Sequence, residues 1–204
     1  MVRLARMLVM VVLASTVAAC DGGAPPAPRA STPAATMSPS AAAGEFPVPP
    51  LRLPTVAPGA PCPVTEPHRW SNPDQAGRVL GPGPLYPVAD YFPDGALRLR
   101  DEDRQPDGTY VKKVRWIGSG YTGPVLVRAG RIDGPGTATA QFSYTGESRD
   151  DGHHAVLTDP ASDLPGTTTV GGPGCYAYQV DGTSFSLNIV FQAIPEATAT
   201  PSTR

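Results

Sequence analysis

Near the C-terminal end of the chain, apolar and polar residues alternate with a period of two. Across 184–193, aromatic or aliphatic residues alternate with mainly polar ones. This period is typical of a β-strand that buries one face. The preceding run, 174–180, has its own alternation of aromatic and small residues. Between the two runs lies Asp181-Gly182, whose residues tolerate the positive φ of a type I′ turn. The pattern predicts a β-hairpin with its turn at Asp181-Gly182.

Similar patterns predict further short strands, separated by Gly-Pro and Asp-Gly turn residues. The predicted strands are Ala96–Arg100, Tyr110–Ile117, Pro124–Ile132, Thr137–Tyr144 and His154–Thr158. No stretch keeps an apolar period of 3.6 residues for three turns, so no long amphipathic helix is expected. Short strands at about ten-residue spacing favour an all-β fold, a single antiparallel β-sandwich over residues 62–195.

An immunoglobulin-like arrangement of the two sheets is compatible with this pattern, but its signature is missing. That family buries a Trp against two paired cysteines and places a Tyr two residues before the second one. Here Trp70 lies too close to Cys62, and Trp116 lies too far along the chain. Pro173 stands two residues before Cys175. We therefore predict a sandwich without assigning it to the immunoglobulin family.

The N-terminus has the features of an export signal. Arg3 and Arg6 precede the apolar run Met7–Ala14, which is too short to cross a bilayer as a helix. Small residues follow, and Val17-Ala18-Ala19-Cys20 resembles the lipobox of bacterial lipoproteins. In that family the leader is removed before the cysteine, and the cysteine thiol receives a diacylglycerol.

This resemblance implies that residues 1–19 are a signal peptide and that Cys20 is the lipidated first residue. Two acyl chains hold a protein stably on a membrane, whereas one chain does so only marginally. The expected location is the cell membrane, lipid-anchored and facing the extracytoplasmic side. The alternative is an ordinary secretory signal cut after Ala19, with Cys20 an incidental thiol.

Residues 20–61 read as a disordered tether rich in proline and alanine. Eleven of the 26 prolines lie here, and large apolar residues are nearly absent. Such a segment buries too little surface to offset its ordering entropy. We expect a spacer that lifts the domain off the membrane. The alternative is a proline-rich docking motif, with Phe46–Pro50 as its best candidate. Residues 196–204 read as a second disordered tail.

The three cysteines fit an exported protein. Lipidation accounts for Cys20, which leaves Cys62 and Cys175 in an oxidising compartment. We predict a disulfide between these two, which ties the start of the domain to its last hairpin. The alternative is two buried free thiols.

Charge argues against nucleic acid as a partner. The formal net charge is −2, and loss of the two leader arginines makes the mature protein more acidic. Lys112, Lys113 and Arg115 form the only dense basic cluster. A short run of this kind on a strand is usually a solvated face.

The most suggestive group of metal-ligating residue types lies in the run Arg149–Asp159. It contains two adjacent histidines and three aspartates: Asp150, Asp151, His153, His154 and Asp159. Imidazoles and carboxylates bind zinc and other divalent ions. Adjacent residues of a strand point to opposite faces, however, so one site cannot easily use both histidines. We expect a polar loop that enters a strand, and no metal site.

Other motifs are weaker still. Gly118–Gly123 matches G-x-G-x-x-G, but the residues that follow it predict a strand, where a dinucleotide site requires a helix. Ser119 lacks the glycine spacing of a nucleophile elbow. Glu66 with His68, and the acidic run Asp101–Asp103, offer isolated pairs without the remaining parts of an acid–base site. We predict no catalytic residues and no cofactor.

The segments Gly123–Pro135 and Gly174–Gly182 are similar to segments of small exported bacterial proteins of unknown function. The resemblance implies a β-rich fold and an exported setting, and no activity. We expect a non-enzymatic binding or accessory domain for an envelope protein, a cell-wall polymer or a small ligand. Four aromatic residues could supply a contact surface or simply pack: Tyr86, Tyr91, Phe92 and Tyr121. The alternative is an envelope hydrolase with an unrecognised site.

Overall fold

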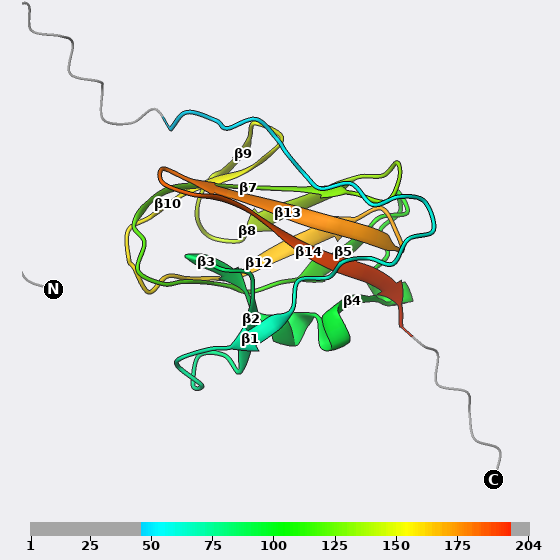
Figure 1. Ribbon diagram of the computed structural model, residues 1–204, viewed down its shortest axis with the longest axis horizontal. Helices are drawn as coiled ribbons and strands as arrows, with labels where there is room; N and C mark the ends of the chain where they lie inside the picture. Colours follow the sequence, from blue (N-terminus) through cyan, green and yellow to red (C-terminus); the bar gives the residue numbers. More distant parts are fainter. Residues whose placement is uncertain (1–45, 197–204) are drawn as a thin grey trace, which may run out of the picture. The chain divides into compact units, whose positions relative to one another are not determined.

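The computed structural model describes residues 46–196, which form strands with three short 3₁₀ turns (Figure 1). The expected leader, Cys20, the first part of the tether and the tail from 197 lie outside the described residues. No helix among residues 46–196 is long and apolar enough to cross a membrane. The predicted all-β fold class is confirmed.

Six strands form the larger sheet, in the order β4-β14-β13-β7-β10-β9. Their bounds are β4 Ala96–Leu99, β14 Ser186–Pro195, β13 Gly174–Gly182, β7 Gly123–Arg131, β10 Gly152–Leu157 and β9 Glu147–Arg149. All neighbours are antiparallel except β4 and β14, which pair in parallel at one edge. This departs from the purely antiparallel prediction, because β4 is distant in sequence and no tight turn joins it to β14.

Two three-stranded sheets form the opposing layer. One has the order β5-β12-β8 and the other β11-β6-β3. Their bounds are β5 Tyr110–Lys113, β12 Gly166–Val170, β8 Ala138–Phe142, β11 Asp163–Leu164, β6 Trp116–Gly118 and β3 Leu85–Pro87. A separate two-stranded hairpin pairs β1 (Pro67–Arg69) with β2 (Arg78–Leu80). The 3₁₀ turns are η1 (Ala89–Tyr91), η2 (Pro93–Gly95) and η3 (Asp101–Asp103).

The core lies between the two layers and draws on both. Trp116 of the smaller layer packs edge-on against Tyr178 of the larger sheet, with ring centroids 5.0 Å apart, and also against Phe142. Tyr178 stacks on Phe191. The Tyr178 hydroxyl also hydrogen-bonds to the Thr168 hydroxyl across the layers, at 2.6 Å. These contacts make the domain a sandwich, and a buried hydrogen bond joins its two layers.

The predicted strands appear with small shifts, except that Tyr110–Ile117 is two strands. β5 and β6 belong to different sheets, and the chain passes from one to the other at Val114 and Arg115. The amide of Val114 still bonds to Gly166, whereas the carbonyl of Arg115 bonds to Val88. The polarity pattern also does not predict β12, whose three consecutive threonines lack an apolar alternation, although β-branched residues favour strands.

The predicted hairpin of β13 and β14 is confirmed, but its predicted turn position is wrong by two residues. Asp181 pairs with Ser186, and the amide of Gly182 donates to the carbonyl of Phe185 at 2.9 Å. The turn therefore lies at Thr183-Ser184. Asp181 is fully buried, so a tertiary contact, rather than local turn preference, determines its place in the strand.

The predicted boundary between tether and domain is also wrong. Residues 46–56, called the strap below, lie along the outer face of the larger sheet, where Figure 1 shows them as a blue and cyan line. Phe46 is buried, and Leu53 and Val56 pack against a buried cluster that includes Ala177 of β13. As a result β13 is buried on both faces. A few apolar anchors and hydrogen bonds from the sheet offset the ordering entropy that favoured disorder.

Cys62 and Cys175 form a disulfide, as predicted, with their Cα atoms 5.5 Å apart. The bond joins the chain just after the strap to the start of β13, across 113 residues of sequence. The disulfide therefore fixes the chain to the sheet a few residues after the strap ends.

Candidate functional site

A groove of about 660 Å³ opens beside β8, between the two layers of the sandwich. Its walls come from β7, β8, the β9–β10 turn and the strap. The lining residues are Leu51, Ala129, Gly130, 136–141 and 148–152. Most of them are glycine, alanine, serine or threonine, so the groove brings a ligand close to the backbone.

The groove exposes the edge of a sheet. β8 is an edge strand and, within residues 46–196, pairs only with β12. The amide of Gly171 donates to the carbonyl of Thr137, so the backbone groups of 137, 139 and 141 point toward β12. Successive residues direct these groups to opposite sides of a strand. The backbone groups of Ala138 and Ala140 therefore point away from β12. Ala140 is buried, whereas Ala138 is partly exposed and can offer its backbone groups to a ligand.

The opposite wall of the groove, formed by β7, also exposes part of a strand edge. β7 continues past the end of its pairing with β10, which stops at the Val127–His153 pair. Ala129 and Gly130 follow, and they line the groove. Two strand edges thus bound one groove, and an extended chain could hydrogen-bond to either.

The rim of the groove is charged and sharply turned. Asp150 and Asp151 have φ values of 54° and 56°, and Arg149 pairs with Gly152 across them. Two consecutive positive φ angles between paired residues are the geometry of a type I′ turn. Arg149 lies 3.5 Å from the Asp150 carboxylate and 3.7 Å from that of Glu147. The rim therefore presents both signs of charge beside the strand edges.

The two histidines point to opposite faces of β10, as the strand pattern predicts. His153 packs edge-on against Phe142 of the core, and its Nε2 bonds to the carbonyl of Thr145 at 2.8 Å. His154 packs against Phe46 of the strap, with ring centroids 5.8 Å apart. The described residues contain no group of three or more His, Cys, Asp or Glu side chains placed to hold a metal ion.

Burial of the His154 imidazole lowers its pKa below the ordinary value of 6.5, and Arg149 lowers it further, against Glu147 and Asp150, which raise it. The unfolded chain therefore binds more protons between the two pKa values, so stability rises with pH across that window. We expect the stability that His154 contributes to be complete above about pH 6.5 and to fall as pH drops through the folded pKa.

The test compares chemical unfolding at pH 7.5 and pH 5.0 in wild type and His154→Gln. Wild type should lose more stability on acidification than the variant, because only wild type must protonate a partly buried imidazole that packs against Phe46. Equal losses in both proteins would contradict the prediction.

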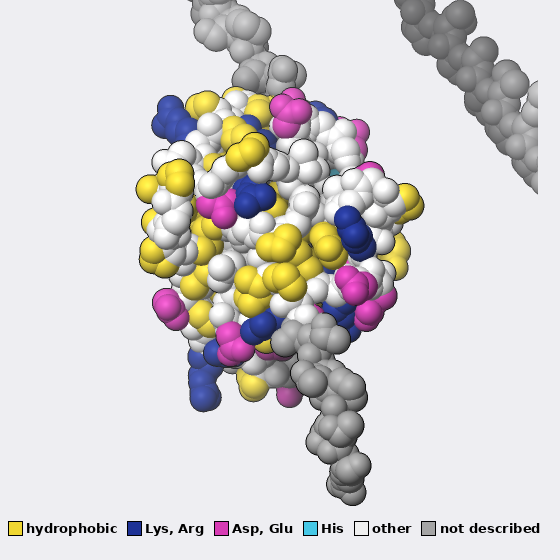
Figure 2. All heavy atoms as spheres, turned by 90° about the vertical axis from the view of Figure 1, so that its right-hand side faces the viewer, with side chains coloured by type: hydrophobic (Ala, Val, Ile, Leu, Met, Phe, Trp, Pro, Cys, Tyr) yellow, Lys and Arg dark blue, Asp and Glu magenta, His cyan; other side chains and the backbone are white. Residues whose placement is uncertain are grey.

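The acidic run Asp101–Asp103 forms η3 and lies in a charged cleft rather than in a catalytic pair. Asp103 pairs with Lys112, and Arg100 pairs with Glu196 and lies 3.7 Å from Glu102. Two adjoining hollows of about 480 and 580 Å³ share Arg100, Glu102 and Glu196 in their walls. Figure 2 views the end of the molecule where the described chain stops, and hydrophobic side chains gather there among acidic and basic ones. Glu102, Asp103 and Glu196 therefore each lie beside a cation, and Asp101 has no ion pair among the described residues.

The basic residues 112, 113 and 115 are also paired with nearby acidic residues in two of three cases. Lys112 pairs with Asp103, and Arg115 forms a two-point contact with Asp163. Arg115 also donates to the carbonyl of Gln75 at 2.7 Å. Two of the three cations are thus neutralised by neighbouring acids, and no basic stripe results.

Glu66 and His68 do not act together. The Nε2 atom of His68 bonds to the carbonyl of Gly81 at 2.8 Å. Gly118–Gly123 joins β6 directly to β7, so a strand follows it, as the sequence predicts. The Tyr121 hydroxyl in this loop donates to the carbonyl of Pro124 at 2.8 Å.

The four aromatic candidates serve in packing. Phe92 lies in the core against Phe191, and Tyr121 packs edge-on against Phe185. Tyr86 packs against Trp70, and Tyr91 is partly buried against the core. Tyr86 and Tyr91 pack against one buried cluster, while Phe92 and Tyr121 pack against other aromatic residues.

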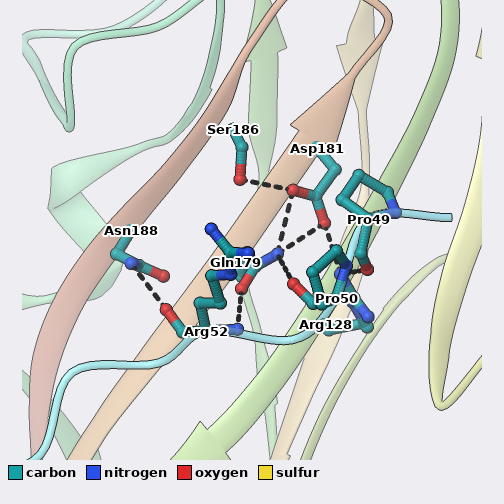
Figure 3. A network of polar contacts seen from close by, with 8 residues as sticks. All are labelled: Pro49, Pro50, Arg52, Arg128, Gln179, Asp181, Ser186 and Asn188. Atoms are coloured by element: carbon teal, nitrogen blue, oxygen red, sulfur yellow. Dashed lines mark hydrogen bonds and ion pairs between the residues drawn. The ribbon is translucent and has the colours of Figure 1, made fainter.

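Sequence patterns missed a polar network on the outer face of the larger sheet (Figure 3). Arg128 Nη2 donates to an Asp181 carboxylate oxygen and to the carbonyl of Pro49, both at 2.7 Å. Asp181 also accepts from Gln179 Nε2, at 2.9 and 3.0 Å, and from the Ser186 hydroxyl at 2.6 Å. The sequence did contain an indication of this network, because Arg128, Gln179 and Asp181 are polar or charged residues within otherwise mainly apolar predicted strands.

The same network holds the strap through its main chain. Gln179 Nε2 donates to the carbonyl of Pro50 at 3.1 Å, and its Oε1 accepts from the amide of Arg52 at 2.6 Å. Asn188 Nδ2 donates to the carbonyl of Arg52 at 3.0 Å. Side chains of the sheet therefore satisfy successive peptide groups of the strap.

No protein-family model, no curated protein and no solved structure matches this chain. Its function is therefore argued from the sites themselves.

Proposed function

We propose that this protein is a membrane-anchored extracytoplasmic lipoprotein whose sandwich domain binds an extended polypeptide segment of an envelope partner. The observation that carries the proposal is the groove beside β8, which is bounded by the free edges of two strands. An extended peptide can add to such an edge as a further strand, gaining affinity from main-chain hydrogen bonds. The small lining residues allow the close approach that this requires, and the charged rim supplies selectivity.

Two features support the anchored, extracytoplasmic setting. The lipobox resemblance at Val17-Ala18-Ala19-Cys20 supplies the anchor. The Cys62–Cys175 disulfide fits an oxidising compartment. Nucleic acid does not enter the proposal, because the acidic balance and the paired cations offer no phosphate-binding surface.

Replacing Cys20 by Ala is expected to release the protein from the cell membrane into the medium. The substitution removes the acceptor for the diacyl group, and two acyl chains are what holds such a protein stably. Immunoblots of membrane and medium fractions measure the distribution, with wild type as the control. Retention of the variant on the membrane would argue against lipid anchoring.

Replacing Ala138 by Pro is expected to reduce partner binding at least tenfold while leaving the fold intact. The proline ring removes an amide that points into the groove rather than toward β12, so no bond of the β8–β12 ladder is lost. A photo-crosslinking residue at exposed Thr139 captures the partner in cells, and mass spectrometry maps the joined peptides.

The matched control carries the same crosslinker at Val156, an exposed residue of β10 outside the groove. A stoichiometric adduct should form from position 139 only. An adduct whose yield is unchanged by Ala138→Pro, or the absence of any adduct, would overturn the proposed site. Adducts with wall polymer would replace the polypeptide by a glycan as the ligand.

The expectation that the protein is not an enzyme remains a prediction. The alternative, an envelope hydrolase, requires a measurable substrate and a loss of its turnover on substituting Asp151, His153 or His154.

A further inference from the structure

The outer face of the larger sheet has the construction of a peptide-binding site, and residues of the same chain fill it. Arg128, Gln179 and Asn188 make four hydrogen bonds with the main chain of the strap. Three are donated to the carbonyls of Pro49, Pro50 and Arg52, and one is accepted from the Arg52 amide. None of the four uses a side chain of the strap. The sheet therefore recognises the peptide groups of an extended segment, as strand-reading and polyproline-reading domains do.

The recognising groups on β7 and β13 are also bonded to one another within the sheet. With the strap in place, Arg128, Gln179 and Asp181 are 5%, 1% and 0% exposed. Asp181 orients both donors, and Ser186 in turn orients Asp181. Side chains that are already bonded to one another lose little entropy on binding, which favours a defined ligand geometry.

The strap sequence matches this face at its apolar positions as well. Phe46 packs against His154, and Leu53 lies over Gly130. A Cβ atom on Gly130 would come within 2.5 Å of the Leu53 side chain, so the face has room for leucine there only because residue 130 is glycine. The prolines at 49 and 50 have no amide hydrogen and leave only carbonyls to be satisfied. Arg128 and Gln179 supply the donors for those carbonyls.

We propose that this face is a recognition site for extended, proline-rich segments and that a second copy of this chain can occupy it with its own residues 46–56. Exchange of an identical element preserves every contact and is a low-cost route to association. The loop 57–61 that would act as the hinge is exposed throughout, and Gly59 has a φ of 80°. The Cys62–Cys175 bond follows at once, so the core stays closed when the strap leaves.

The first experiment tests recognition between separate molecules. A protease site is placed between Gly59 and Ala60 in the full chain carrying Cys20→Ala, and the folded protein is cut. A fluorescent peptide of residues 46–56 is then added, and its anisotropy is measured. The cut chain should bind the peptide saturably, and the uncut chain should bind it at least a hundredfold more weakly, because its own strap competes at high effective concentration.

A scrambled peptide of the same composition is the control. A cut chain that keeps its near-ultraviolet circular dichroism but binds neither peptide would overturn the proposed recognition site. Equal binding of the two peptides would do the same, because it would show no dependence on sequence.

The second experiment tests whether the strap of one chain binds to the sheet of a second copy, and it uses uncut chains. One chain carries Arg52→Cys and the other carries Asn188→Cys, two positions joined by a hydrogen bond within one molecule. The two are mixed and oxidised, and intermolecular disulfides are mapped by mass spectrometry. Exchange predicts a 52–188 link between chains, well above the link formed with a control chain carrying Asp74→Cys at an exposed position of the β1–β2 turn. A yield no higher than the control would overturn exchange between copies.

The strap contributes Leu51 to the groove beside β8, but both experiments measure binding of the strap itself and use neither an envelope partner nor the lipid. Ala138→Pro changes no hydrogen bond between the sheet and the strap, so it should leave both results unchanged, and failure of the proposed function and failure of strap exchange are distinguishable.

Discussion

Asp181→Ala is expected to lower the free energy of unfolding by about 3–5 kcal/mol, the range measured when one partner of a buried ion pair is removed. The Asp181 carboxylate is fully buried and accepts hydrogen bonds from Arg128, Gln179 and Ser186. Its loss leaves the Arg128 guanidinium, which is 5% exposed, without a counter-charge. Guanidinium chloride unfolding measures the effect, and the midpoint should fall without a change in slope.

Ser186→Ala provides the matched control. It removes one neutral donor from the same carboxylate and should cost on the order of 1 kcal/mol. If Asp181→Ala lowered the free energy of unfolding by no more than Ser186→Ala does, the Arg128 guanidinium would have to become solvated once the Asp181 carboxylate is removed, which would contradict the prediction.

A double variant separates the stability of the sheet from the docking of the strap. Apolar replacement of a whole buried pair is often neutral, so Arg128→Met with Asp181→Leu should recover much of the stability lost by Asp181→Ala. It cannot restore the donor to the carbonyl of Pro49. The strap of the double variant should therefore be cut by protease sooner than that of wild type.

Replacing both Cys62 and Cys175 by Ser is expected to cost about 2–5 kcal/mol. The disulfide closes a loop of 113 residues, and in the chain-entropy model a long loop removes much freedom from the unfolded state. Substituting both residues avoids leaving a free thiol. Unfolding midpoints measured with and without a reductant report the change.

Treatment of wild type with reductant is the control for the loss of stability caused by removing the disulfide. Reductant should destabilise wild type by about as much as the double substitution does, and it should leave the double variant unchanged. A double variant within about 0.5 kcal/mol of wild type, the range typical of a surface substitution, would mean that the bond adds little beyond the packing around it.

Local patterns were sufficient to predict several parts of the molecule. The period of two in 184–193 predicted β14, and alternation predicted that His153 and His154 point to opposite faces. The cysteine count predicted the Cys62–Cys175 bond, because the expected lipidation of Cys20 leaves only one pair. These predictions depend on backbone geometry and simple counting, which neighbours in space do not alter.

Other parts depended on partners distant in the sequence. Asp181-Gly182 has the local preference of a hairpin turn, yet Asp181 extends the strand because Arg128 of β7 compensates its charge. Residues 46–56 have the composition of a tether, yet they lie on the sheet because Gln179 and Asn188 satisfy their peptide groups. The groove beside β8 likewise depends on where β10 stops pairing with β7, which no local pattern specifies.

The sequence by itself determined the all-β class, the main hairpin, the cysteine pairing and the expectation of a lipid anchor at Cys20. Only the tertiary structure decided where the domain begins, where the hairpin turns and which polar groups form a site. The physical reason is that a buried charge or an unpaired carbonyl is costly alone and favourable with a partner. That partner comes from another strand, and only the folded chain brings the two together.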